Sequence, residues 1–311
     1  MPPESAARCE GHYRLTVAPR FQLRRTFVGR IDRNGGVERR GDCLYPRDDW
    51  RSLKPEELSA LVVEGAGPGA LLPSTQLGLL EIPERLRGAW WREAEKSTGS
   101  EGFEGVFSAL VEFLRFKRLP LPERVHLEVA VNAPNLPSTR GAPSGAAQGL
   151  AYRDRPAARN GRARQAVGLV NLGDEAAFIA LLDLPPSTLV ARLEAAGDAE
   201  ASALSPDQLV KRYFEIFPRE PLLRVRLDPG EGLWLPPEGV VHDGWTHGKR
   251  DLDVVLSVRM EIGDEAQEAG RAGEGLAEPE SRAASAAARR TGRPASTKAI
   301  PKMRGRTRAH P

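Results

Sequence analysis

Apolar and polar residues alternate along much of the chain, and the period of this alternation predicts secondary structure. Over residues 124–132, RVHLEVAVN, the period is two, as expected of a β-strand. The two faces of this strand would carry Val125, Leu127, Val129 and Val131 on one side and His126, Glu128 and Ala130 on the other. One apolar face and one mixed face are typical of a strand that covers a core.

Short apolar runs bounded by turn residues predict further strands between residues 165 and 260. They are QAVGLVNLG (165–173), AFIALLDL (177–184), LLRVRLDPG (222–230), GLWLPP (232–237), VVHDGWT (240–246) and LDVVLSVRM (252–260). About seven or eight strands within roughly 140 residues favour a β-sandwich or barrel over an alternating βαβ fold.

Two segments inside this strand region change to the helical period. PSTLVARLEAAG (186–197) ends at Gly197, a typical position just after a helix. SPDQLVKRYFEIFP (205–218) begins with the capping-box pair Ser205 and Gln208. We therefore predict a helical insertion between the strands.

Residues 1–120 mix both periods. YRLTVAP (13–19) and TFVGRI (26–31) are predicted strands, and ERLRGAWWREAEK (84–96), which follows Pro83, is a predicted helix. We interpret residues 1–120 as a mixed α/β flank that braces a barrel formed by residues 121–262.

Composition sets the C-terminal segment apart. After Met260 the aromatic residues end, and Ala, Gly, Glu, Ser and Arg dominate. Such a segment buries too little apolar area to offset the entropy of ordering it, so residues 263–311 are predicted to be disordered. Residues 281–311 hold nine Lys or Arg and no Asp or Glu. This basic tail either makes weak contacts with a polyanion such as nucleic acid or only aids solubility.

Several protein classes are disfavoured by the sequence. The formal net charge of +3 comes from the basic tail, which leaves the rest of the chain mildly acidic and unlike a nucleic-acid-binding domain. Cys9 and Cys43 are the only cysteines, too few for a disulfide framework. The first residues do not form a signal peptide, and no apolar run reaches the length of a membrane span. We expect a soluble cytoplasmic protein without membrane contact.

The segment PEGVVH (237–242) contains a short motif of a known family. Pro237, Gly239 and His242, with Gly230 upstream, resemble the second conserved motif of the cupin superfamily. The resemblance implies a double-stranded β-helix, also called a jelly-roll or cupin-like barrel. It also implies that His242 points at a metal ion from the first residues of a strand.

The residues after this motif resemble the late half of the Fe(II)/2-oxoglutarate-dependent oxygenases. In that family a histidine is followed by an Arg or Lys that binds the carboxylate of 2-oxoglutarate. Here His242 or His247 would be the metal ligand, and Arg250 or Arg259 would bind 2-oxoglutarate. A guanidinium suits this role because it forms two parallel hydrogen bonds with a carboxylate. The implied reaction is the hydroxylation of an unknown small-molecule or protein substrate.

Such an iron site needs two imidazoles and one carboxylate, and the early half of the site has two alternatives. The first is Tyr152-Arg153-Asp154, in which Asp154 supplies the carboxylate and Tyr152 stands where the family has its first histidine. The second is the H-x-E of His126 and Glu128. Each candidate residue also has a possible structural role. Asp154 lies among arginines with which it can form ion pairs, and Arg259 needs an anionic partner if it is buried.

The same residues allow two further interpretations of function. A tyrosine in place of the first histidine favours a cupin-like module that has lost its metal and acts in binding. A cupin with another divalent metal, such as Zn, Mn or Ni, would bind metal without any dependence on 2-oxoglutarate.

Overall fold

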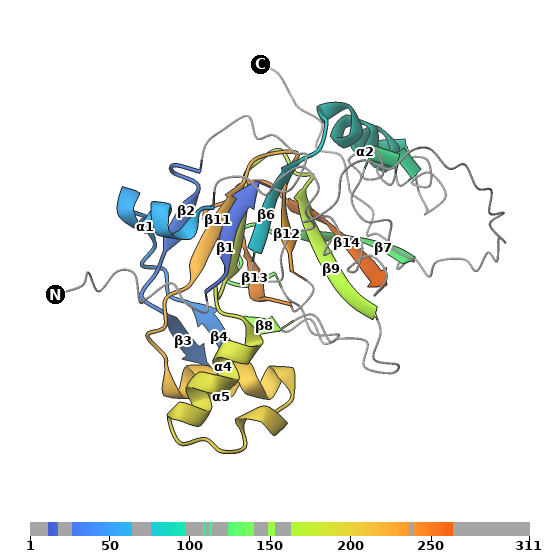
Figure 1. Ribbon diagram of the computed structural model, residues 1–311. Helices are drawn as coiled ribbons and strands as arrows, with labels where there is room; N and C mark the ends of the chain where they lie inside the picture. The colour runs from blue at the N-terminus through green and yellow to red at the C-terminus, as the bar shows by residue number, and fades with distance from the viewer. Residues whose placement is uncertain are drawn as a thin grey trace.

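Two β-sheets face each other in the computed structural model (Figure 1). The structure describes residues 12–17, 27–63, 76–96, 108–109, 112–113, 124–139, 149–152, 163–236 and 239–263. Sheet A has the order β1 (Arg14–Val17), β6 (Gln76–Glu81), β12 (Glu231–Leu235), β9 (Ala163–Asn171), β14 (Asp253–Gly263) and β7 (Arg124–Asn132). Sheet B has the order β5 (Arg51–Ser52), β2 (Ile31–Arg33), β11 (Leu223–Leu227), β10 (Ala177–Leu181), β13 (Val241–Trp245) and β8 (Ala151–Tyr152). A separate hairpin consists of β3 (Val37–Arg40) and β4 (Cys43–Pro46).

The strands predicted between residues 124 and 260 are all present, with bounds that differ by no more than about three residues. Neighbouring strands of the two sheets pair in antiparallel fashion, except for the parallel pair of β1 and β6. The predicted fold class, mainly β with flanking helices, is confirmed.

The strand predicted over residues 26–31 is wrong for most of its length. Phe27–Arg30 form a turn, closed by a hydrogen bond from the Arg30 amide to the Phe27 carbonyl (3.1 Å). Gly29 has a φ of +71°, in the left-handed region that no regular strand uses. Of the described residues 27–31, only Ile31 lies in a strand, at the start of β2.

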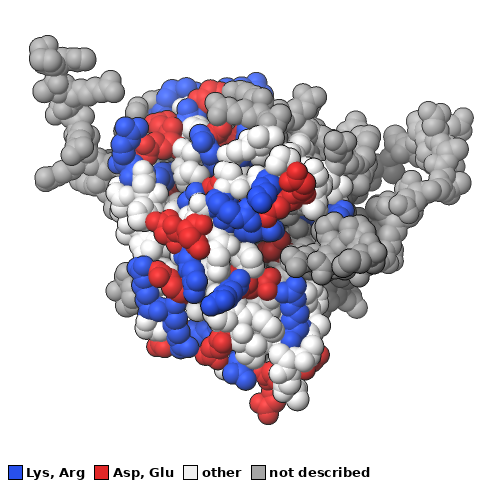
Figure 2. All heavy atoms as spheres, turned by 90° about the vertical axis from the view of Figure 1, so that its left-hand side faces the viewer, with Lys and Arg blue, Asp and Glu red and all other residues white. Residues whose placement is uncertain are grey.

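The N-terminal 120 residues contribute to both sheets. β1 and β6 extend sheet A beyond β12, and β2 and β5 extend sheet B beyond β11. The short helix α1 (Pro55–Leu61) buries Leu61 against the core between the sheets. Around it, on the face that carries α1 and β2, acidic and basic side chains are interleaved, so no large patch of one charge forms there (Figure 2).

The predicted helical insertion consists of α4 (Pro186–Ala195), the 3₁₀ turn η2 (Ala201–Ala203) and α5 (Pro206–Ile216). The capping box is confirmed: the Ser205 hydroxyl accepts from the Gln208 amide, and the Gln208 side chain accepts from the Ser205 amide. After α4, Gly197 takes a φ of +95°, as predicted for a residue that ends a helix.

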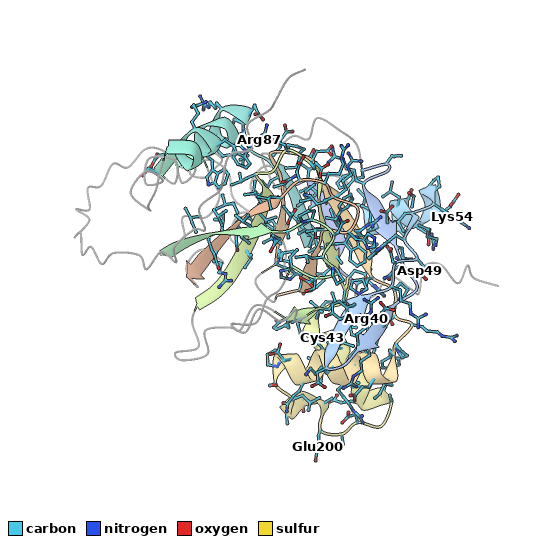
Figure 3. The ribbon with its side chains drawn as sticks, turned by 180° about the vertical axis from the view of Figure 1, so that it is seen from behind. Arg40, Cys43, Asp49, Lys54, Arg87 and Glu200 are labelled. Carbon is cyan, nitrogen blue, oxygen red and sulfur yellow. The ribbon has the colours of Figure 1, made fainter. Side chains whose placement is uncertain are left out.

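Three apolar clusters hold these elements together. One lies between the two sheets and contains Leu233 of β12 and Val225 of β11. A second joins sheet A to the helix α2 (Glu84–Lys96) through Trp90. Arg87 of the same helix (Figure 3) forms ion pairs with Glu84 and with Asp174 of the β9–β10 turn, each at 2.8 Å. The third cluster packs α4 and α5 against sheet B and the β3–β4 hairpin.

The predicted disordered tail lies almost entirely outside the described residues, which end at Gly263, the last residue of β14. Among the described residues, no helix has the length and apolar character needed to span a membrane.

Candidate functional site

His242 is buried between the two sheets. Its backbone pairs with Leu181 of β10, and directly opposite residues in an antiparallel pair share one face. Leu181 belongs to the core between the sheets, whereas Val241, the preceding residue, belongs to the cluster under α4 and α5. The imidazole therefore points into the interior, and the residue is only 2% exposed.

The hydrogen bonding of His242 fixes which ring nitrogen carries the proton. Nδ1 lies 2.7 Å from the carbonyl oxygen of Val240. Because a carbonyl oxygen only accepts, Nδ1 must carry the hydrogen, and the lone pair of the neutral ring is then on Nε2. Metal-binding histidines are commonly oriented by a bond of this kind. The imidazole thus has the inward direction and the tautomer typical of a metal-binding histidine.

The partner of His242 on β8 is Ala151, which differs from the sequence hypothesis. That hypothesis placed Tyr152 at the position of a first histidine. The register pairs His242 with Ala151 and Val241 with Tyr152. Tyr152 consequently lies on the other face and packs with the α4–α5 cluster. A shift of one residue in the pairing exchanges the two faces of a strand, so the sequence alone could not decide whether Ala151 or Tyr152 faces His242. Asp154 lies outside the described residues.

His247 is not brought together with His242. It follows the end of β13, whereas His242 stands at its start, and the strand between them spans roughly 10 Å or more. Its side chain is 58% exposed, lies 3.8 Å from Asp48 and stacks on Trp245 with ring centroids 5.8 Å apart. These contacts suit a surface residue.

The two candidate arginines occupy different places. Arg250 is 89% exposed and pairs with Glu175, whose carboxylate also accepts from the backbone amides of Asp251 and Arg250. These backbone hydrogen bonds, led by that from Asp251, lower the pKa of Glu175 to about 2.

Arg259 lies on β14 at a position that shares a face with Val255 of the inter-sheet core. Its guanidinium is half-buried and lies 3.6 Å from Glu128 of β7. Glu128, proposed in one alternative as a metal ligand, is thus the anionic partner of Arg259. His126 pairs with Arg259 through the backbone of β7 and β14.

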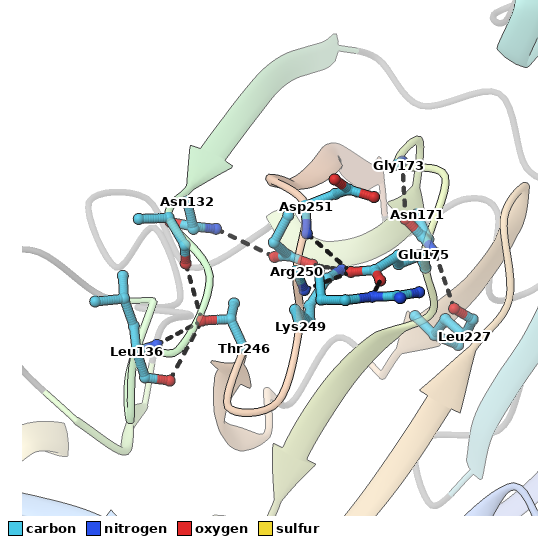
Figure 4. Close-up of polar contacts among 12 residues, drawn as sticks. Asn132, Leu136, Asn171, Gly173, Glu175, Leu227, Thr246, Lys249, Arg250 and Asp251 are labelled. Carbon is cyan, nitrogen blue, oxygen red and sulfur yellow. Dashed lines mark hydrogen bonds and ion pairs between the residues drawn. The ribbon is translucent and has the colours of Figure 1, made fainter. Parts of the chain in front are cut away.

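One polar cluster was not predicted from the sequence. Lys249 Nζ and Asp253 Oδ1 are 2.7 Å apart, and both side chains are buried, at 2% and 4% exposure. Asn132 of β7 donates to the other carboxylate oxygen at 3.3 Å. Thr246 binds the segment after β7 through its contacts with Ala133 and Leu136 (Figure 4). The burial of the pair depends on tertiary packing, for which the local sequence carries no signal.

Within the described part of the chain, no three His, Cys, Asp or Glu side chains are grouped so as to hold a metal ion. Among the sequence candidates for metal ligands whose side chains are described, which are His242, His247 and Glu128, only His242 lies in the interior. Asp154 and the side chain of His126 lie outside the described part of the structure.

No family model matches this chain, and a search of curated proteins finds no match. Solved structures give weak similarities. The non-heme alpha ketoglutarate dependent carbocyclase SnoK from nogalamycin biosynthesis is 14% identical, with a TM-score of 0.36, over 60% of this chain and 80% of that one. HygX from Streptomyces hygroscopicus, with iron bound, is 12% identical, with a TM-score of 0.31, over 60% of this chain and 82% of that one. Similarities this low support no conclusion about the chemistry of this chain.

Proposed function

We propose that the chain is a double-stranded β-helix protein that binds Fe(II) through His242 and uses 2-oxoglutarate to hydroxylate a substrate. The strand order supports the fold. Counted from β7 to β14, the strands take the order 6-3-8-1 in sheet A and 5-4-7-2 in sheet B. Such an order, with two facing four-stranded antiparallel layers, is that of the jelly-roll barrels.

The observation that carries the metal proposal is the setting of His242. It is a buried, inward-pointing imidazole at the start of a strand, with Nδ1 bound to a backbone carbonyl and the lone pair on Nε2. In this proposal Asp154 supplies the carboxylate ligand. Bound iron would activate dioxygen, which is the oxidant: one oxygen atom would go to the substrate as the hydroxyl group and the other to 2-oxoglutarate, which would leave as succinate and CO2.

Arg259 is the better of the two candidates for 2-oxoglutarate, because it shares a face with the inter-sheet core. Arg250 lies outside, engaged with Glu175. Arg259 already binds the carboxylate of Glu128, and a cosubstrate carboxylate would take the place of Glu128 on the guanidinium.

The test is a metal titration of the purified full chain with Fe(II) without oxygen, and with Co(II) as a spectroscopic substitute. We expect near-stoichiometric binding that His242→Ala abolishes. His247→Ala is the matched control, because it removes an exposed imidazole, and it should bind as the wild type does. Absence of metal binding in the wild type, or equal loss in both variants, would contradict the proposal. Zn, Mn or Ni binding without 2-oxoglutarate decarboxylation would favour the other cupin chemistry instead.

A second candidate is a metal-free binding module of the same fold. The observation in its favour is Ala151, because a methyl group occupies the place directly opposite His242 on β8. This candidate predicts that neither the wild type nor His242→Ala takes up metal.

A further inference from the structure

We propose that Tyr13 positions His242: its hydroxyl group fixes the carbonyl of Gly239, where the turn before His242 ends, and so sets the direction and tautomer of the imidazole. The relevance of this role to metal binding rests on the proposed function above. The role itself depends only on the described contacts.

Tyr13 connects the two segments on either side of His242. It is fully buried in the core between the sheets. Its amide donates to the carbonyl of Asp183 at 2.6 Å, two residues beyond Leu181, the backbone partner of His242. Its hydroxyl donates to the carbonyl of Gly239 at 2.9 Å, three residues before His242. One residue from the N-terminal flank therefore holds both the neighbouring strand end and the turn.

The turn controls the imidazole because Val240, the acceptor for Nδ1 of His242, directly follows Gly239. Gly239 has a φ of +81°, and a Cβ there would lie 2.7 Å from the ring of Tyr152. Tyr152 therefore limits movement of the turn on one side, while the Tyr13 hydroxyl fixes its carbonyl on the other. If the Gly239 carbonyl is released, the backbone at Val240 gains freedom to rotate; the Val240 carbonyl can then turn away from Nδ1, which loses the acceptor that keeps its proton.

The hydroxyl group has a role distinct from that of the aromatic ring. A phenylalanine would fill the same apolar space, but it would leave the Gly239 carbonyl without this buried donor. His12 strengthens the attachment nearby, since its Nδ1 lies 3.1 Å from Asp183 Oδ2. The segment His12–Tyr13 thus holds the turn through the side chain of Tyr13 and holds the end of β10 through both residues.

The test is Tyr13→Phe in metal-free full-length protein with ¹⁵N-labelled histidine, with the ring-nitrogen shifts recorded by NMR. We expect the His242 ring of the wild type to carry its proton on Nδ1 alone, and the variant to show a mixture of tautomers. Tyr213→Phe is the matched control. The Tyr213 hydroxyl contacts Arg192 and Glu220, and Arg192 lies 3.5 Å from His12 Nε2. The control should therefore change the His12 signal and not that of His242. An unchanged His242 in Tyr13→Phe, or an equal change in both variants, overturns the proposal.

A measurement on the native chain covers the case in which Tyr13→Phe does not fold. Hydrogen exchange at the amides of Tyr13 and Leu182, which donate to Asp183 and Val241 respectively, should show similar protection. Much faster exchange at Tyr13 would mean that it opens independently of the turn, and the proposal would fail.

Metal titration separates this inference from the proposed function. If the wild type binds metal, Tyr13→Phe should bind it about tenfold more weakly, as is common for groups that orient a ligand, and unchanged affinity overturns the positioning role. If the wild type binds none, the proposed function fails, and the tautomer measurement still decides the role of Tyr13.

Discussion

Replacing Lys249 by methionine should destabilise the protein severely, although the side chain lies in a turn between two strands. The ammonium group is 2.7 Å from Asp253, and the two side chains are 2% and 4% exposed. Removing one partner of a buried ion pair typically costs about 3–5 kcal/mol, because the remaining charge stays buried without compensation. Asn132 still donates one hydrogen bond to Asp253, so we expect a loss near the lower end, about 3 kcal/mol.

The assay is urea unfolding of four proteins followed by circular dichroism. Lys249→Met should lower the unfolding midpoint strongly. The double variant Lys249→Met with Asp253→Leu should recover most of the loss, because both charges are gone. Arg250→Ala is the matched control in the same turn, since its ion pair with Glu175 is exposed and should contribute little. A loss below about 1 kcal/mol in Lys249→Met, or no recovery in the double variant, would refute the argument.

Two further predictions concern the ion pair of Glu57 and two glycines with positive φ. The pKa of Glu57 is lowered from an ordinary 4.5 to about 2, mainly by the hydrogen bond from Arg51. The ionised Glu57 therefore stabilises the fold fully above about pH 4.5, and this contribution is lost as the pH falls towards 2. Glu57→Gln should lower the free energy of unfolding by about 1 kcal/mol at neutral pH, a small amount because Arg51 is half-exposed. In urea unfolding, the difference from the wild type should vanish near pH 2. A difference that stays constant with pH would contradict this. Gly41→Ala should cost about 1–2 kcal/mol through its φ of +61° alone. Gly149→Ala should cost more, because its Cβ would lie 2.2 Å from the Leu44 carbonyl oxygen, and equal thermal shifts in the two variants would show that this contact has no effect.

The sequence predicts the elements whose signals are local. β7 follows from alternation over nine residues, and α5 follows from the pair Ser205 and Gln208 together with an apolar stripe. The turn at Phe27–Arg30 was missed because its apolar residues suit a strand, and only the left-handed Gly29 breaks it.

The candidate site was harder to predict because its features depend on pairing between distant segments. β8 has two residues, too few for a periodic signal, so its pairing with β13 alone decides that Ala151 faces His242. His242 was a candidate from the sequence, yet its inward direction follows from the register with β10. The burial of Lys249 depends on packing that no local pattern describes.

The hydrogen bond between Tyr13 and Gly239 has a consequence for the order of assembly. The two residues are 226 positions apart in the chain. At ordinary rates of synthesis, Tyr13 is made roughly 10 to 45 s before Gly239. During that time β1 can already pair with β6, its neighbour in sheet A. Because contacts between distant parts of a chain form slowly, the surroundings of His242 should be among the last parts of the protein to become native.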